Sequence, residues 1–149
     1  MYVNLDDLLE AWRVNNVITL ELLDLCPDET FELKPGKGKT IRSNFVHIVW
    51  LRAQAILEKF SKADVPKLDW KTATREEITD ALNQTHQQMG DVFRKRIEKP
   101  VKMGVLTFFS YLIAHEAHHR SQIEIALRLN GAEPKEELAF YNLWQFEKK

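Results

Sequence analysis

The sequence predicts an all-α protein, an antiparallel four-helix bundle with a short C-terminal helix or strap. Apolar residues recur at helical spacing over four long segments. Only 5 glycines occur among 149 residues, which favours long helices over many short strands. The hydrophobic fraction of 44% and the charged fraction of 29% are ordinary for a soluble globular protein. The length suits one domain, residues 1–149, with a sizeable single core.

The first half of the chain carries two of the expected helices. One runs from Leu5 to Cys26 and ends before Pro27, and the other runs from Thr40 to Phe60. Their apolar positions are Leu5, Leu8, Leu9, Trp12, Leu20 and Leu23 in the first helix, and Val46, Val49, Trp50, Ala53, Leu57 and Phe60 in the second. We expect the charged connection between them, residues 27–39, to be a crossover. In the next loop, residues 61–73, Trp70 is expected to cover one end of the core.

The second half of the chain carries the other two helices. Thr74 and Glu77 have the spacing of a capping box, which opens a third helix that extends to about Glu98. Its apolar stripe consists of Ile78, Leu82, Met89, Val92 and Phe93. The fourth helix spans residues 104–131, with Gly131 as its C-terminal cap.

The fourth helix has apolar residues on two faces. Leu106 and Ile113 lie opposite its core stripe, so a second face of this helix needs a cover. Residues 133–149, expected to form a short helix and an apolar strap, are one candidate cover, and a second copy of the chain is the other. The pattern therefore indicates a homodimer as an alternative to the strap.

Composition excludes several classes of protein. A net charge of −1 gives no general attraction to nucleic acid or to an anionic membrane. No apolar run reaches the ~18 residues that a membrane span needs. The N-terminal segment has acidic residues early and does not have the pattern of a signal peptide. A single cysteine, Cys26, rules out an internal disulfide framework, so we expect a cytoplasmic location.

Two histidines at helical spacing point toward the core. In a helical projection, His119 lies within the apolar stripe of the fourth helix and His115 lies beside it. The polar residues Ser110, Arg120, Ser121, Glu124 and Arg128 fall on the other side. A buried imidazole needs a partner, and one divalent metal ion satisfies two imidazoles spaced i and i+4. The alternative is two core histidines that are hydrogen-bonded to carbonyls or hydroxyls, but the pairing favours a metal.

Two further histidines lie at the borders of apolar stripes. His47 borders the apolar face of the second helix, and periodicity alone does not decide between a ligand and a surface residue. His86 lies one turn from Leu82 and Met89, where an edge position is favoured over a ligand. Four-helix bundles build metal sites from facing helices, so a histidine from the second helix can join two from the fourth.

The run from His115 to His119 also matches the H-E-x-x-H pattern of zinc peptidases, in which the glutamate activates water. Such an enzyme needs a third ligand downstream, for which Glu133, Glu136 and Glu137 are available. It also needs an edge strand for its peptide substrate, and the sequence predicts none. In the projection Glu116 lies toward the polar side, either solvated or contacting a ligand. The peptidase is therefore the less favoured alternative.

Three pieces of the chain resemble the DinB/YfiT-like superfamily. The run His115-x-x-x-His119-Arg120-Ser121-Gln122 resembles the H-x-x-x-H-R-G-Q signature of that superfamily, with Ser121 in place of glycine. Residues 40–48 resemble the segment that leads into its other signature histidine, and residues 141–144 resemble the tail of one branch. The resemblance covers nearly the whole chain.

The resemblance implies a four-helix bundle, often dimeric, with a divalent metal on His47, His115 and His119. Known members include thiol-dependent transferases and a maleylpyruvate isomerase that uses a low-molecular-weight thiol. Zinc or nickel is the first expectation for the metal, and iron or copper also suits three imidazoles.

The resulting hypothesis is a metal-dependent enzyme that performs S-transfer or hydrolysis on a small molecule. A non-catalytic metal-binding or ligand-binding bundle is the alternative. Helical position suggests that Asn16, Gln54, Tyr111 and Gln122 line the pocket. The sequence assigns no role to Glu116, His118 or Arg120.

Overall fold

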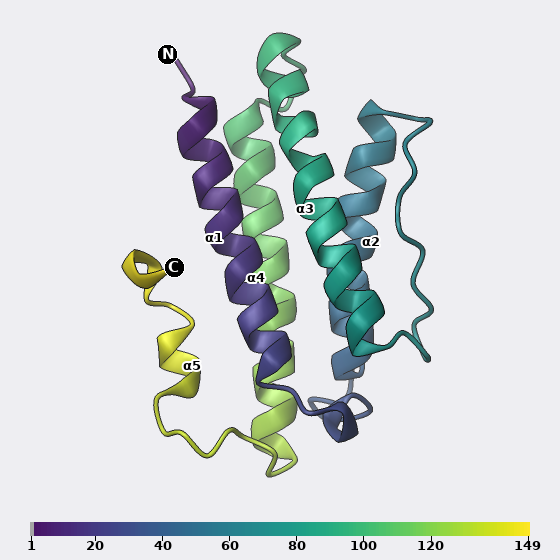
Figure 1. The fold of residues 1–149 in the computed structure, drawn as a ribbon, viewed down its shortest axis with the longest axis vertical. Helices are drawn as coiled ribbons and strands as arrows, with labels where there is room; N and C mark the ends of the chain where they lie inside the picture. Colours follow the sequence, from purple (N-terminus) through teal and green to yellow (C-terminus); the bar gives the residue numbers. More distant parts are fainter. Residues whose placement is uncertain (1) are drawn as a thin grey trace.

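The computed structural model describes residues 2–149, and this part of the chain contains helices and no strand (Figure 1). The four long helices are α1 (Leu5–Asp24), α2 (Ile41–Lys59), α3 (Arg75–Glu98) and α4 (Val105–Leu129). A short helix, α5 (Ala139–Asn142), follows them, and two 3-10 turns lie at Asp28–Thr30 and Phe146–Lys148. The prediction of an all-α four-helix bundle is confirmed.

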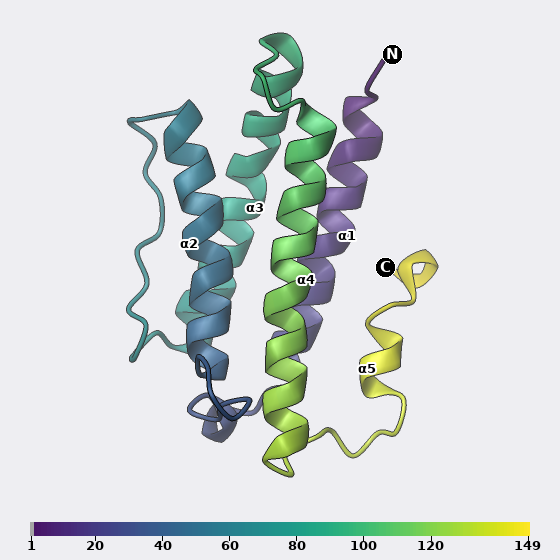
Figure 2. The same ribbon diagram turned by 180° about the vertical axis from the view of Figure 1, so that it is seen from behind.

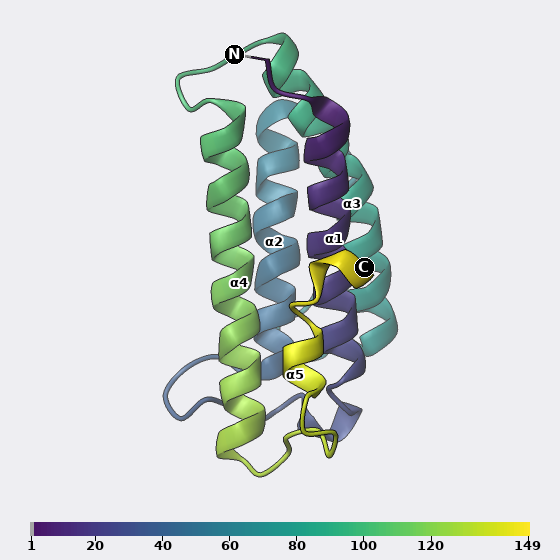
Figure 3. The same cartoon turned by 90° about the vertical axis from the view of Figure 1, so that its left-hand side faces the viewer.

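The four helices do not simply alternate in direction. The helix α3 packs between α1 and α2, and α4 packs against α2 on the other side of the bundle (Figures 1 and 3). The pairs α1–α3 and α2–α4 are antiparallel (Figures 1 and 2). The pair α2–α3 is parallel, because residues 60–74 return along the length of α2 (Figures 1 and 2). The crossover is therefore the connection of residues 60–74. The prediction that residues 27–39 form the crossover was wrong.

Local signals fix most helix ends close to their predicted places. The capping box at the start of α3 is formed in both directions: Thr74 accepts from the Glu77 backbone, and Glu77 accepts from the Thr74 backbone. Asn4 caps α1 by accepting from the backbones of Asp6 and Asp7. Gly131, just beyond α4, has φ 66°, a conformation that glycine adopts without steric cost.

The core has two apolar parts separated by a polar layer. One part, at the N-terminal end of α1 and the C-terminal end of α2, is centred on Trp12, whose ring packs edge-on against Phe93 at 5.4 Å and Phe109 at 6.2 Å. The other part joins the opposite ends of the same helices and includes Phe31 and Phe45. Buried polar residues from α1, α2, α3 and α4 lie between them, namely Asn15, Asn16, Thr19, Arg52, Thr85, Glu116 and Arg120.

The helix α2 is covered on two faces, which explains why its periodicity was misleading. The predicted stripe residues Val46 and Val49 are buried in the core, and with Ala53 they also line a cavity of about 220 Å³ beneath the crossover. A second set of α2 residues that the stripe did not include, Phe45, Ile48, Arg52, Ala55 and Ile56, also faces the bundle. Trp50, expected in the stripe, is 44% exposed, so that assignment was wrong.

The C-terminal segment covers part of α4, as predicted. The side chains of Phe140 and Leu143 are buried against the core, and the Arg128 guanidinium lies 4.8 Å from the Phe140 ring centroid. Figure 3 shows α5 lying across α1 and α4. Leu106, at the other end of α4, is 46% exposed, and the homodimer stays a prediction. No helix among residues 2–149 is both long and apolar enough to cross a membrane.

We expect Thr74→Ala to lower the free energy of unfolding by about 1 kcal/mol, because it removes the side-chain half of the α3 capping box. Urea denaturation followed by circular dichroism measures this change. Thr107→Ala is the matched control, since Thr107 is exposed on α4 and has no capping role. An equal loss in both variants would show that the capping box contributes nothing specific.

Candidate metal centre

Three histidines from two facing helices lie together at mid-bundle. His47 comes from α2, and His115 and His119 come from α4, one turn apart. One ring nitrogen from each histidine can be chosen so that all three lie within 4.8 Å of one another. His119 is 7% exposed, while His47 and His115 are only partly buried, so the cluster is closed on its core side and open on its outer side.

Asn44 fixes the protonation of His119. The Asn44 amide nitrogen donates to the backbone oxygens of Lys39 and Thr40, so its Oδ1 is the atom left to face His119. That oxygen lies 2.8 Å from His119 Nδ1, which must therefore carry the proton and donate it. The Nε2 lone pair of His119 then points to the cluster, as a metal-binding imidazole requires.

The spacing of the nitrogens fits a tetrahedral metal ion. The Nε2 atoms of His115 and His119 lie 3.2 Å apart. Two ligands at 2.0–2.1 Å from a tetrahedral zinc ion are about 3.3 Å apart. His115 Nδ1 is buried without a partner among the described residues. The spacing of His115 and His119 therefore suits two ligands of one divalent ion, and His47, within 4.8 Å of both, is near enough to supply a third.

The histidines are held neutral. Burial, with help from the Lys39 ammonium and from His115, lowers the pKa of His47 to about 4. Burial, with help from His115 and His47, lowers the pKa of His119 to about 3. The pKa of His115 is also lowered, chiefly by burial. Near neutral pH all three rings are free of the proton that a metal ion would have to displace.

The open side of the cluster is lined by a cation and three aromatic rings. Lys39 Nζ lies 3.2 Å from His47 Nδ1. The Trp50 ring stacks on His47 at 5.3 Å and the Trp70 ring lies 5.7 Å from it. Tyr111 lies 6.1 Å from the His115 ring. Trp70, expected at one end of the core, instead lies beside the cluster because the crossover returns along α2.

Beneath the histidines lies a buried ion pair. Arg52 of α2 binds Glu116 of α4 through two hydrogen bonds, Nε to Oε1 at 2.6 Å and Nη2 to Oε2 at 2.9 Å. Both side chains are at most 1% exposed. Burial alone would raise the pKa of Glu116, but the Arg52 guanidinium together with Arg120 and the Asn15 amide outweighs it, and the pKa lies below its ordinary value. The carboxylate is therefore charged.

The ion pair is the centre of a larger polar network that reaches α1. Asn15 donates to Glu116 at 2.6 Å and accepts from Arg120 at 2.9 Å. Arg52 also donates to Asn16 at 2.8 Å. The helical projection placed Glu116, Arg120 and Glu124 on the polar side of α4, and this was wrong, because α1 covers that side and buries all three.

This geometry argues against the zinc peptidase alternative. Both carboxylate oxygens of Glu116 are bound by Arg52 and Asn15, so neither is free to activate a water molecule. The described chain, residues 2–149, also offers no edge strand to align a peptide. The third member of the cluster is His47, not a downstream glutamate.

Comparison with known families identifies the chain. The model of the DinB family matches residues 1–148. The chain belongs to the DinB family. No curated protein and no solved structure gives a significant match.

The remaining histidines of this DinB-family chain lie outside the cluster. His86 stacks against Trp12 at a ring separation of 6.5 Å, and its backbone oxygen accepts from the indole nitrogen. His118 is exposed on α4. Of the pocket residues suggested by helical position, Tyr111 lies beside His115, whereas Asn16 belongs to the buried network and Gln54 lines the cavity under the crossover.

Sequence reasoning missed Lys39 as a neighbour of the site, and it gave Asn44, which borders the same helix face as His47, no role. Asn44 lies three residues before His47 and so shares its helix face, which is a signal that the sequence did contain. Lys39 comes from the connection before α2, whose conformation no periodicity reveals. In this DinB-family protein both act on the protonation of the histidines.

We expect Glu116→Gln to lower the free energy of unfolding by about 3 kcal/mol, because it leaves the Arg52 guanidinium buried without its counter-charge. The double variant Arg52→Met, Glu116→Leu removes both charges and should be more stable than the single variant. Urea denaturation at pH 7 measures both. Glu10→Gln, in an exposed pair with Arg13, is the control and should cause no measurable change. A double variant that is less stable than the single variant would contradict this account of the ion pair.

We expect the metal-free protein to lose stability as pH falls below about 6.5. The unfolded chain protonates its histidines near pH 6.5, whereas folded His47 and His119 stay neutral down to about 4 and 3. The unfolded state then binds more protons, so the contribution is complete above pH 6.5 and is lost towards the folded pKa values. His119→Gln should show a shallower loss of urea midpoint between pH 7 and pH 4.5. If the urea midpoint fell equally with pH in the wild type and in His119→Gln, the lowered pKa of His119 would be contradicted.

Proposed function

We propose that this protein is a metal-dependent enzyme in which His47, His115 and His119 bind one divalent ion. The observation that carries the proposal is the convergence of three neutral imidazoles on one point, closed by Asn44 inside and open outside. We further propose that it transfers a thiol to a small electrophilic molecule, which the resemblance to thiol-dependent members supports. A bound divalent ion would lower the pKa of a thiol or water molecule so that it becomes a nucleophile near neutral pH.

The protein side chains supply orientation and charge around that point. Asn44 holds the His119 ring in one tautomer, and the Arg52–Glu116 pair ties together the two helices that carry the histidines. Lys39 is the cation at the open side, where it can pair with the negative charge of a bound thiolate. Trp50 and Trp70 restrict the approach of water from the crossover side.

Zinc or nickel is the proposed metal, because imidazole nitrogen suits both and the 3.2 Å spacing suits tetrahedral zinc. Iron and copper also accept imidazole ligands. Hydrolysis by a metal-bound water is the alternative reaction, and the same site would perform it. The assay below separates the two reactions, because S-transfer consumes a thiol and hydrolysis does not.

We expect the purified protein to hold about one divalent ion per chain, and His47→Ala, His115→Ala and His119→Ala each to lose it. Asn44→Ala should lower metal affinity about 10- to 100-fold, since it frees the His119 tautomer. Elemental mass spectrometry and competition with a chromogenic chelator measure these changes. His86→Ala and His118→Ala are matched controls, which should retain the metal.

The same proteins are then assayed for consumption of a low-molecular-weight thiol with a small electrophile such as monobromobimane. Metal-dependent consumption that the His variants lose supports the transferase. Metal binding without turnover of thiols or esters would favour a non-catalytic metal-stabilised bundle. Retention of metal in the three His variants would overturn the proposed site.

A further inference from the structure

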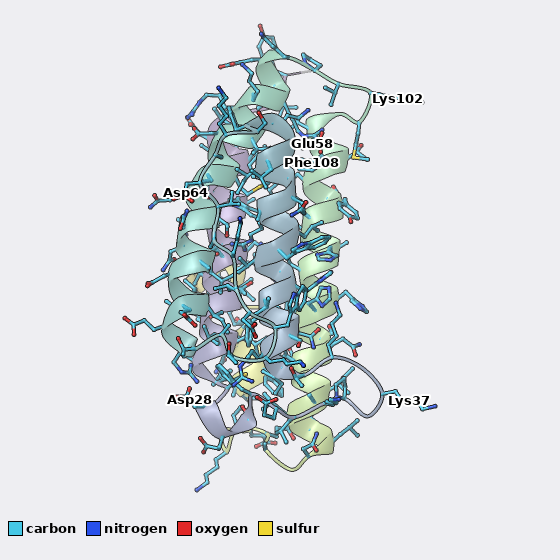
Figure 4. All side chains as sticks on the ribbon, turned by 90° about the vertical axis from the view of Figure 1, so that its right-hand side faces the viewer. Asp28, Lys37, Glu58, Asp64, Lys102 and Phe108 are labelled. Carbon is cyan, nitrogen blue, oxygen red and sulfur yellow. The ribbon has the colours of Figure 1, made fainter. Side chains whose placement is uncertain are left out.

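A groove lies at the end of the bundle where α2 ends and α4 begins. It encloses about 400 Å³ and is lined by Glu58 of α2, Arg96 of α3, Lys102 and Met103 of the connection, and Phe108 and Tyr111 of α4. Figure 4 shows Glu58 and Phe108 beside each other at this end, with Lys102 on the loop beyond them. Its apolar walls and its charges of both signs suit a small amphipathic molecule.

Arg96 is the unusual residue of this groove, because it is buried without a full set of partners. It is 6% exposed, and its guanidinium lies 3.7 Å from the centroid of the Phe108 ring. Its two hydrogen bonds are long, 3.3 Å to the Met103 carbonyl and 3.4 Å to Glu58. Its Nε is buried with no partner among the described residues.

Arg52 of α2, another buried arginine, shows what a fully paired guanidinium looks like in this protein. Arg52 binds a fully buried carboxylate through bonds of 2.6 and 2.9 Å. The only carboxylate that pairs with Arg96 among the described residues is that of Glu58, whose side chain is 58% exposed. A buried guanidinium with free donors is a strong binding point for a carboxylate, which it can hold through two parallel hydrogen bonds. Lys102 adds a second positive charge at the rim.

Tyr111 brings the groove close to the histidine cluster. Tyr111 lines the groove, and its ring lies 6.1 Å from the His115 ring. Phe108, on which Arg96 stacks, precedes His115 by seven residues, which is about 10 Å along the helix. An extended chain covers that distance in about eight bonds.

We propose that this groove binds the carboxylate end of an elongated small-molecule substrate or thiol. The carboxylate binds Arg96, the apolar part lies over Met103 and Phe108, and the reacting end reaches His115 past Tyr111. The inference rests on the proposed function for the reacting end only, since the carboxylate site is complete without the metal. It specifies an organic acid whose carboxylate lies about 10 Å from the reacting atom.

The first experiment measures the carboxylate site alone. Octanoate is titrated by calorimetry into metal-free wild-type protein, with octanol as the uncharged comparison. We expect octanoate to bind at least about tenfold more tightly than octanol, because a charge-assisted bond contributes more than a neutral one. Arg96→Gln should abolish this preference, Arg96→Lys should keep part of it, and Glu58→Gln should increase it by removing the competing carboxylate. Absence of the preference, or its survival in Arg96→Gln, would overturn the proposal.

The second experiment measures the distance to the metal. Zinc-loaded protein is titrated with ω-mercaptoalkanoic acids of 3 to 12 carbons and with the matching ω-mercaptoalcohols. The preference for acid over alcohol should peak near a separation of about eight bonds and vanish in Arg96→Gln, while alcohol affinity stays unchanged. A preference independent of length would overturn the link between groove and cluster. If no thiol binds while octanoate still does so through Arg96, the proposed function fails and the carboxylate site stands.

Discussion

The buried ion pair between Arg52 and Glu116 is the interaction on which the arrangement of this molecule depends. Arg52 lies five residues after His47, and Glu116 directly follows His115. Two short hydrogen bonds between a planar guanidinium and a carboxylate allow only one register of α2 against α4. A slide by one turn would leave two charges in the core without partners, at a cost of several kcal/mol. The pair therefore contributes specificity, by fixing which residues of the two helices face each other.

Charge explains why the site suits an anionic ligand. The cluster consists of three imidazoles that are neutral near pH 7, so it brings no negative charge to a divalent ion. The cation beside it is Lys39, and the groove beyond Tyr111 contains two cations, Arg96 and Lys102, and one carboxylate, Glu58. A divalent ion bound there would keep its net charge and would attract a thiolate or a carboxylate more strongly than a neutral molecule. The proposed thiol site and the proposed carboxylate site thus call for the same kind of anionic small molecule.

The sequence predicted the helices well because helix formation depends on local signals. The capping pattern of Thr74 and Glu77 and the periodic apolar residues each act over one or two turns. It predicted the burial of α4 less well, because periodicity cannot tell which of several helices covers a polar face. Glu116 and Arg120 have the composition of a solvated face, but they are buried because Arg52 of α2 and Asn15 of α1 supply partners. His47 could be placed near His115 only through family resemblance, since their proximity depends on packing between distant segments.

The crossover gives the molecule an interlocked construction. It joins one helical pair, α1 and α2, to another, α3 and α4, and each long helix packs chiefly against members of the other pair. Neither half holds a complete apolar core by itself, and the histidines are divided between them, one in the first half and two in the second. The two halves, α1–α2 and α3–α4, thus pack like the two subunits of a heterodimer that are joined by a linker. A bound ion would cross-link the two halves at that internal interface. If the chain were cleaved within residues 60–74, the metal would then favour reassociation of the two fragments.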